Sequence, residues 1–210
     1  MYDPKVGQRG QSLVELALFM PIFIIVISGI VEMGYYFIGF LRVLDATREA
    51  ARFASDLDPS WNYNSSYIYD HNSPRFEREL DVTTDCNNVF DLWGSTACYA
   101  AEQAGGLRDN GYDDIVLSAY SIRDGVVVRQ YPEDNSNGFS LTGNQVTLKD
   151  GAALATSYAG APPDGIVVVE IFRLHRQAMC FPLFTVFVPC DIGIYEWSIF
   201  VNPTAASYAQ

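Results

Sequence analysis

The chain has 210 residues, and 49% of them are hydrophobic. Its formal net charge is −12 at pH 7, and residues 57–210 hold most of that excess, with eight Lys or Arg against nineteen Asp or Glu. This acidity argues against nucleic acid or anionic lipid as a partner, because both are bound by basic patches. Residues 57–210 are enough for one domain with a real core and too few for two.

Residues 11–41 contain an apolar segment of membrane length. Sixteen uncharged residues separate Glu15 from Glu32, and the apolar run continues to Leu41. A bilayer crossing needs ~20 largely apolar residues. A secretory signal would have an apolar core of roughly 7–15 residues and end in a small-residue cleavage site, and this segment has neither feature. We therefore expect it to remain in the mature protein.

A short charged leader, residues 1–10, precedes this segment. It carries Lys5 and Arg9. Positive charge on the N-terminal side of an apolar segment favours a cytoplasmic N-terminus. We therefore predict a single-pass protein of the cytoplasmic membrane, with residues 57–210 forming an exported domain.

The end of the leader resembles the processing site of type IV pilin-like proteins. The run there is Gly10-Gln11-Ser12-Leu13-Val14-Glu15, and the apolar segment follows it directly. Together with Gly29-Ile30-Val31-Glu32-Met33-Gly34 and the segment 46–54, this run looks like the TadE-like family. That family comprises pseudopilins of tight-adherence (Flp-type) pilus systems. The resemblance covers about the first quarter of the chain.

The resemblance implies both a processing step and an assembly step. A prepilin-type peptidase would cut between Gly10 and Gln11, and Glu15 would meet the N-terminal amine of a neighbouring subunit. The other partners would be pilins or pseudopilins, the pilus assembly machinery and the lipid bilayer. The product would be a homo- or hetero-oligomer that reaches the cell surface.

The charged residues and the proline of the apolar segment also have interpretations from elementary chemistry. A carboxylate at the edge of hydrocarbon is costly unless paired, which points to a function for Glu15; alternatively, Ser12 and Glu15 form a capping box at a helix start. Glu32 lies about 25 Å further along a helix that rises ~1.5 Å per residue, near the opposite face of the bilayer. It would act in assembly or extend to the interface. Pro21 removes one helical hydrogen bond and favours a kink, which membrane helices tolerate.

The periodicity predicts that one helix spans residues 11–56. Its lower half is apolar all round, and its upper half is amphipathic, with one face predicted for Leu44, Thr47, Ala51 and Ala54. A polar loop rich in aromatic residues follows at 57–74. Its aromatic side chains would either make a surface contact, for example by stacking on sugars, or pin the loop to the core. The candidates for a surface contact are Trp61, Tyr63, Tyr67 and Tyr69.

The four cysteines all fall in the predicted exported domain. An even number in an exported chain indicates disulfides. Pairing of sequence neighbours would give Cys86–Cys98 and Cys180–Cys190, because short loops close most readily. Three pairings are possible on paper. A zinc site would need closer spacing than these cysteines have.

The remainder of the chain predicts a helix followed by an antiparallel sheet. The helix is expected from Ser95 to about Leu107, on the strength of its alanines. An Asp-Gly pair between two apolar runs predicts a hairpin turn at 123–125. Strands are expected at 115–122, 126–131, 166–175 and 192–201. The predicted fold class is therefore α+β and pilin-like, with the long helix laid against a sheet of at least four antiparallel strands.

The sequence indicates no enzyme and no cofactor. His71 and His175 are the two histidines, and neither lies near a nucleophile motif. No phosphate loop or metalloprotease motif is present, and no metal site is predicted. The function expected is that of a pilus subunit or pseudopilin. The alternative is an anchored surface protein that does not polymerise and binds a ligand, such as a carbohydrate, through its aromatic loop.

Overall fold

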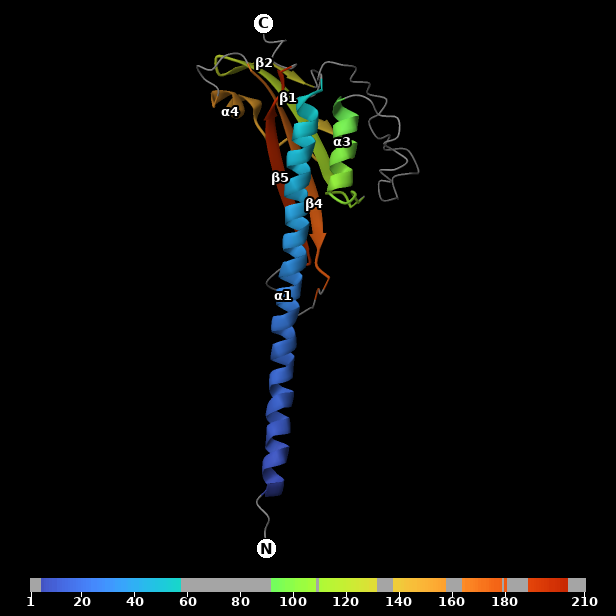
Figure 1. The fold of residues 1–210 in the computed structure, drawn as a ribbon, viewed down its shortest axis with the longest axis vertical. Helices are drawn as coiled ribbons and strands as arrows, with labels where there is room; N and C mark the ends of the chain where they lie inside the picture. Colours follow the sequence, from blue (N-terminus) through green and yellow to red (C-terminus); the bar gives the residue numbers. More distant parts are fainter. Residues whose placement is uncertain are drawn as a thin grey trace.

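A single long helix dominates the molecule. The computed structural model describes residues 5–57, 92–108, 110–131, 138–157, 164–178, 180 and 189–203, with side chains of the first helix from residue 12 onward. Helix α1 (Lys5–Ser55) has 51 residues. Its lower part stands clear of the rest of the chain, and its upper part lies against a β-sheet (Figure 1). The predicted α+β arrangement is confirmed.

Within the described residues, the sheet is antiparallel and has five strands. The strand order is β2-β1-β4-β5, and β3 pairs with β1 beyond the end of β2. The strands are β1 (Asp114–Arg123), β2 (Val126–Tyr131), β3 (Phe139–Ser140), β4 (Asp164–Arg176) and β5 (Asp191–Val201). The four predicted strands are all present, each within two residues of its expected bounds. The short strand β3 was not predicted.

The hairpin between β1 and β2 forms where the Asp-Gly pair predicted it. Asp124 and Gly125 have φ angles of 52° and 75°. Positive φ at both central residues is the conformation whose twist matches a two-residue antiparallel hairpin. Local sequence was sufficient here because the turn depends on two adjacent residues.

The upper part of α1 buries a stripe of mostly small side chains. The stripe consists of Val43, Ala46, Thr47, Ala50, Ala51 and Ala54. Leu44, which was predicted on this face, is only half-buried, and Val43 takes its place. The stripe is displaced because α1 packs against α3 (Leu92–Gln103) as well as against β4 and β5. Helix α3 contributes a matching row of alanines, Ala97, Ala100 and Ala101, and Ala104 just after the helix continues it.

The bounds of α3 differ from the prediction. The helix begins at Leu92, three residues before Ser95, and ends at Gln103 rather than near Leu107. Leu92 and Trp93 are buried, so packing rather than local propensity sets the start. The end is set by Gly105 and Gly106, whose φ angles are 85° and 86°, because such residues close a helix by bonding back to its last carbonyls.

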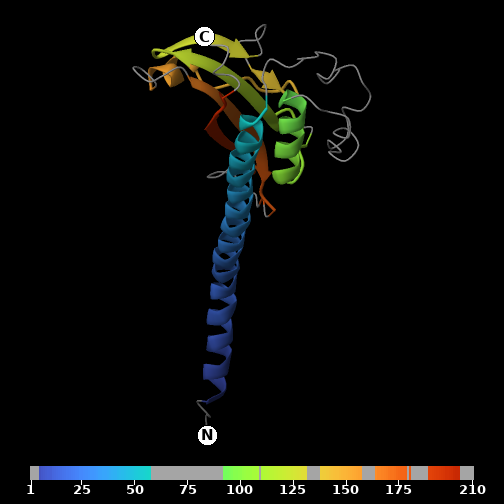
Figure 2. The same cartoon turned by 45° about the horizontal axis from the view of Figure 1, so that its top comes forward.

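Both faces of the sheet are covered at β4. One face carries Val167, Val169 and Ile171 toward α1 and α3, in the larger core cluster. The other face carries Ile166 and Val168, which pack with Ala155 of the short helix α4 (Gly151–Thr156). Figure 2 shows α3 beside the upper end of α1, with α4 near the far edge of the sheet. This double burial explains why β4 reads as a continuous Val and Ile run instead of an alternating one.

Candidate assembly helix and its junction with the sheet

The lower part of α1 exposes almost all of its apolar side chains. From Leu13 to Leu41 nearly every large hydrophobic residue is exposed, several by more than half. The helix is long and apolar enough to cross a membrane, and none of its most apolar window is buried inside the molecule. A soluble core helix would bury this surface. The arrangement is therefore consistent with a single-pass membrane anchor.

The helix runs through the predicted processing and assembly residues without a break. It begins at Lys5, so the predicted cleavage point between Gly10 and Gln11 lies within helix, although the side chains of these two residues are outside the described part. Glu15 is exposed one turn above this point. Helix α1 also continues through Pro21 without interruption. The lower part of α1 shows no sharp bend (Figure 1).

Small residues leave unoccupied space on the exposed surface of α1. A Cβ atom added at Gly29 or Gly34 would meet nothing within 4 Å. The neighbouring Ser28 donates its hydroxyl to the carbonyl of Ile25 at 2.8 Å, so its polar group is satisfied within the helix. Small, internally satisfied positions let a second helix come close.

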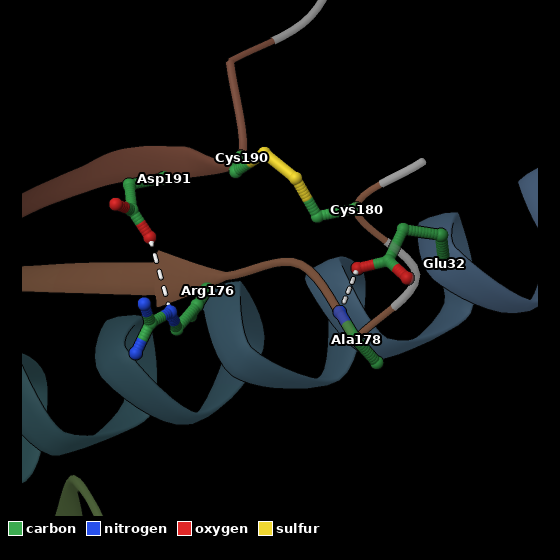
Figure 3. The surroundings of a disulfide bond; sticks show 6 residues. All are labelled: Glu32, Arg176, Ala178, Cys180, Cys190 and Asp191. Atoms are coloured by element: carbon green, nitrogen blue, oxygen red, sulfur yellow. Dashed lines mark hydrogen bonds and ion pairs between the residues drawn. A yellow bond between two sulfur atoms is a disulfide. The ribbon is translucent and has the colours of Figure 1, made fainter. Parts of the chain in front are cut away.

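Glu32 is held by the sheet domain, which neither of its predicted interpretations included. Its Oε1 accepts a hydrogen bond from the backbone N–H of Ala178 at 2.9 Å (Figure 3). His175 Nε2 lies 3.7 Å from the same oxygen. Both side chains are 14% exposed. The end of β4 thus lies against α1 at the depth of Glu32. A carboxylate partnered in this way is less costly at the edge of hydrocarbon.

His175 fits onto one face of α1. Its ring meets that of Tyr36 edge-on, with centroids 5.5 Å apart, and a Cβ added at Gly39 would lie 3.7 Å from its Nδ1. Glu32, Tyr36 and Gly39 are spaced by four and three residues, so they share a helix face. His175 therefore has a packing role at this junction.

A disulfide lies just beyond the contact between α1 and the end of β4. Cys180 and Cys190 are bonded, with Cα atoms 5.4 Å apart, which confirms this predicted pair. The backbone N–H of Gln177 donates to the carbonyl of Cys190 at 2.9 Å and extends the β4–β5 ladder to the disulfide. Arg176 and Asp191 form an exposed ion pair at 3.7 Å beside it (Figure 3).

The other predicted contact residues are largely beyond the described part of the chain. Cys98 is disulfide-bonded, while Cys86 is outside the described residues, so the Cys86–Cys98 pairing stays a prediction. Trp61, Tyr63, Tyr67 and Tyr69 also lie outside them. A surface-contact role for this aromatic group therefore stays a prediction as well.

Three buried carboxylates hold loops onto the sheet. Asp114 accepts hydrogen bonds from the Ser140 hydroxyl and from the backbone N–H groups of Thr142 and Gln145. Asp113 and Glu170 each accept three further bonds, the latter from Thr147, Leu148 and Tyr195. Carboxylates bonded in this way are structural. Within the described residues, no three His, Cys, Asp or Glu side chains group as a metal site would need.

Comparison with known proteins finds one family model that matches the N-terminal part of the chain. Residues 10–52 match the family model described as TadE-like protein, which confirms the resemblance over that segment. No curated protein and no solved structure matches the chain. The matched segment contains Glu15, Pro21, Glu32 and most of the buried stripe of α1. It does not contain His175 and Ala178, which lie 143 and 146 residues beyond Glu32 and could not be found from local sequence.

Proposed function

We propose that this chain, anchored by α1 and carrying a TadE-like segment at residues 10–52, is a pseudopilin. It would be inserted in the cytoplasmic membrane, trimmed after Gly10, and built into or required for a tight-adherence filament. The observation that carries the proposal is the exposed apolar surface of α1 between Leu13 and Leu41. TadE-like proteins are in general not enzymes, and we propose a non-enzymatic role here too.

The physical basis of assembly is the exchange of lipid for neighbouring helices. A bundle of α1 helices from several subunits keeps the same apolar side chains away from water, so little hydrophobic free energy is lost on leaving the bilayer. The open positions at Gly29 and Gly34 support close contact between such helices. The sheet domain would remain on the outside of the bundle.

Glu15 supplies the test of this proposal. It is exposed in the apolar segment, where a carboxylate is stabilised by a positive partner such as the amine of a neighbouring subunit. We expect Glu15→Ala to insert in the membrane and to be trimmed to Gln11 like the native chain, but to be absent from filaments. The measurements are membrane fractionation, the N-terminal mass of the isolated chain, and its amount in sheared filament preparations.

Glu49→Ala is the matched control. Glu49 is an exposed carboxylate on the same helix, above the apolar segment. This variant should enter filaments normally. Normal incorporation of Glu15→Ala would rule out the assembly role of Glu15. A chain that stays a monodisperse monomer and binds a ligand would instead indicate the anchored binding protein.

A further inference from the structure

Four arginines from three parts of the chain line one pocket. The pocket has a volume of about 130 Å³ and lies between α1, the connection from α3 to β1, and β4 with β5. Its lining includes Arg42, Arg108, Arg173, Arg176, His175 and Gly39. The whole chain has 13 Lys and Arg and a net charge of −12, so a group of four arginines is a strong local departure from its composition.

Arg42 and Arg173 both line this pocket, and their guanidinium groups approach each other beside Gly105. A Cβ added at Gly105 would lie 3.0 Å from Arg42 Nη1 and 3.7 Å from Arg173 Nη1. The φ angle of Gly105 is 85°, a conformation suited to glycine, and the missing side chain leaves room for both groups. The two Nη1 atoms lie 3.0 Å and 3.7 Å from the same point, so they are no more than about 6.7 Å apart. Two positive charges this close are unfavourable unless an anion lies between them.

The guanidinium group of Arg173 has an unused hydrogen-bond donor. Its Nη1 is buried and has no hydrogen-bond partner within the described residues. Burial lowers the pKa of Arg173; the Asp113 carboxylate opposes this effect, and the Arg108 and Arg42 charges add to it. Asp113 is already engaged, since it accepts bonds from the backbone N–H groups of Leu174 and Arg108 and from Asn110.

The other charged groups near the pocket have partners of their own. Arg176 pairs with Asp191 at 3.7 Å, and His175 faces Glu32 at the same separation. Arg42 and Arg173 are therefore the pair that an incoming anion would neutralise. Arginine is also the side chain best shaped for this task, because its planar fork matches two oxygens of a phosphate group.

The position of the pocket along α1 determines which anion it would meet. With Glu15 at the inner edge of hydrocarbon, Gly39 lies about 36 Å and Arg42 about 40 Å further along the helix axis. A bilayer has a hydrocarbon core ≈ 30 Å thick and measures ≈ 40–45 Å with both headgroup layers, so the outer headgroup layer lies roughly 30–37 Å from the inner edge of the hydrocarbon, at the level of Gly39. Helical side chains lean toward the N-terminus, so the Arg42 guanidinium extends back toward the headgroup layer. Tyr35 and Tyr36 lie about two helical turns before Arg42. Tyrosines are enriched at membrane–water interfaces, which supports this placement.

We propose that this pocket binds the phosphate group of a phospholipid in the outer leaflet of the membrane. The proposal depends on α1 crossing the membrane and does not depend on filament assembly. It also revises the expectation from composition, which argued against anionic lipid because the chain as a whole is acidic. Net charge is a property of the whole chain, whereas recognition of a headgroup needs only one basic site.

The test uses the full chain as a monomer in neutral detergent. Native mass spectrometry would count bound phosphatidylglycerol and give its apparent Kd, with inorganic phosphate as a competitor in a second series. We expect the native chain to bind one phosphatidylglycerol more tightly than the Arg42→Gln, Arg173→Gln double variant, by roughly tenfold or more, which is the effect of losing hydrogen bonds to a charged group. Millimolar inorganic phosphate should not displace the lipid.

The matched control is the Arg123→Gln, Arg129→Gln double variant. It removes the same charge from the β1–β2 hairpin, away from the pocket. Its lipid affinity should stay within twofold of the native value. Equal losses in both double variants would overturn the proposal in favour of non-specific charge attraction. Displacement of the lipid by phosphate would overturn it in favour of a free-phosphate site.

A stability measurement covers the case in which the variant fails to fold. Removal of one like charge from the pocket should leave the lipid-free melting temperature of Arg173→Gln equal to or above that of the native chain. Phosphatidylglycerol should then raise the melting temperature of the native chain and not that of the variant. A marked fall in the lipid-free melting temperature would show that Arg173 is a structural residue, and that result would also overturn the proposal.

Discussion

At the residue scale, Glu170 shows how a buried charge is accommodated in this sheet. It lies in the middle of β4 and is fully buried. Its oxygens accept bonds from the hydroxyl groups of Thr147 and Tyr195 and from the backbone N–H of Leu148. An isolated carboxylate here would be strongly destabilising, and these three donors replace the water that it loses on folding.

The hydrogen bond between Tyr195 and Glu170 predicts a pH dependence of stability. Burial, followed by the bond to Glu170, raises the pKa of Tyr195 well above its ordinary value of 10.0. Above pH 10 the unfolded chain releases this proton while the folded chain keeps it, so the free energy of unfolding falls as pH rises. Tyr195→Phe should lower stability by about 1–3 kcal/mol at pH 7 and make the fall above pH 10 shallower.

Denaturant titrations of the full chain in detergent between pH 8 and pH 11 would measure both effects. Tyr35→Phe is the control, because Tyr35 is exposed on α1. It should change neither the stability at pH 7 nor the slope above pH 10. An unaltered slope in Tyr195→Phe would mean that the Tyr195 proton is not linked to folding.

At the element scale, the contact between α1 and α3 depends on small side chains. Ala46, Ala50 and Ala54 of α1 are buried in the same core cluster as three alanines of α3 and the alanine that follows it. Alanines on both helices allow the two backbones to approach closely, and they leave no space for a larger group. The upper end of α1 is further fixed by Asn202, whose side-chain amide donates to the carbonyls of Ala54 and Leu57.

This packing predicts a difference between two alanines of the same helix. Ala50→Leu should lower the free energy of unfolding by roughly 1–3 kcal/mol, because three extra carbons must enter a filled core. Ala17→Leu, in the exposed apolar part, should leave it unchanged. Thermal unfolding followed by circular dichroism would compare the two variants in detergent. Equal stability of both would mean that the helices can move apart at little cost.

At the scale of the whole molecule, α1 forms both an exposed apolar segment and part of the core of the sheet domain. Its lower part has its apolar surface exposed, while its upper part supplies six buried residues to the domain core. The boundary lies near Glu32, the lowest residue of α1 that the described part of the sheet domain contacts by a hydrogen bond. A truncation before residue 31 should thus remove the exposed apolar segment and leave the domain core intact. A truncation before residue 56 should remove part of that core.

Two fragments test this division. Residues 31–210 keep Glu32 and the whole buried stripe of α1, so the fragment should unfold cooperatively as a monomer once its disulfides have formed. Residues 56–210 lack the stripe and should expose the faces of α3 and the sheet, so we expect aggregation and no cooperative transition. Size-exclusion chromatography and thermal melts would separate the outcomes. A cooperative melt of the shorter fragment at the same temperature would show that α1 is not part of the core.

The sequence by itself determined the features that depend on neighbouring residues. The apolar length of α1, the hairpin at Asp124 and Gly125, the four longer strands and the Cys180–Cys190 pair all follow from composition or spacing within short segments. The TadE-like motif is likewise local, between residues 10 and 52. Its processing and assembly roles, at Gly10, Gln11 and Glu15, stay predictions, because they involve other molecules.

Only the tertiary structure decided the features that join distant segments. The choice of Val43 over Leu44 for the buried stripe depends on where α3 packs, and the bonds of Glu32 depend on where β4 ends. The pocket of Arg42, Arg108 and Arg173 joins three parts of the chain that share no local pattern. Periodicity shows which residues are buried or exposed, but not which distant residues meet. The order of the strands and the position of α1 across them determine those contacts.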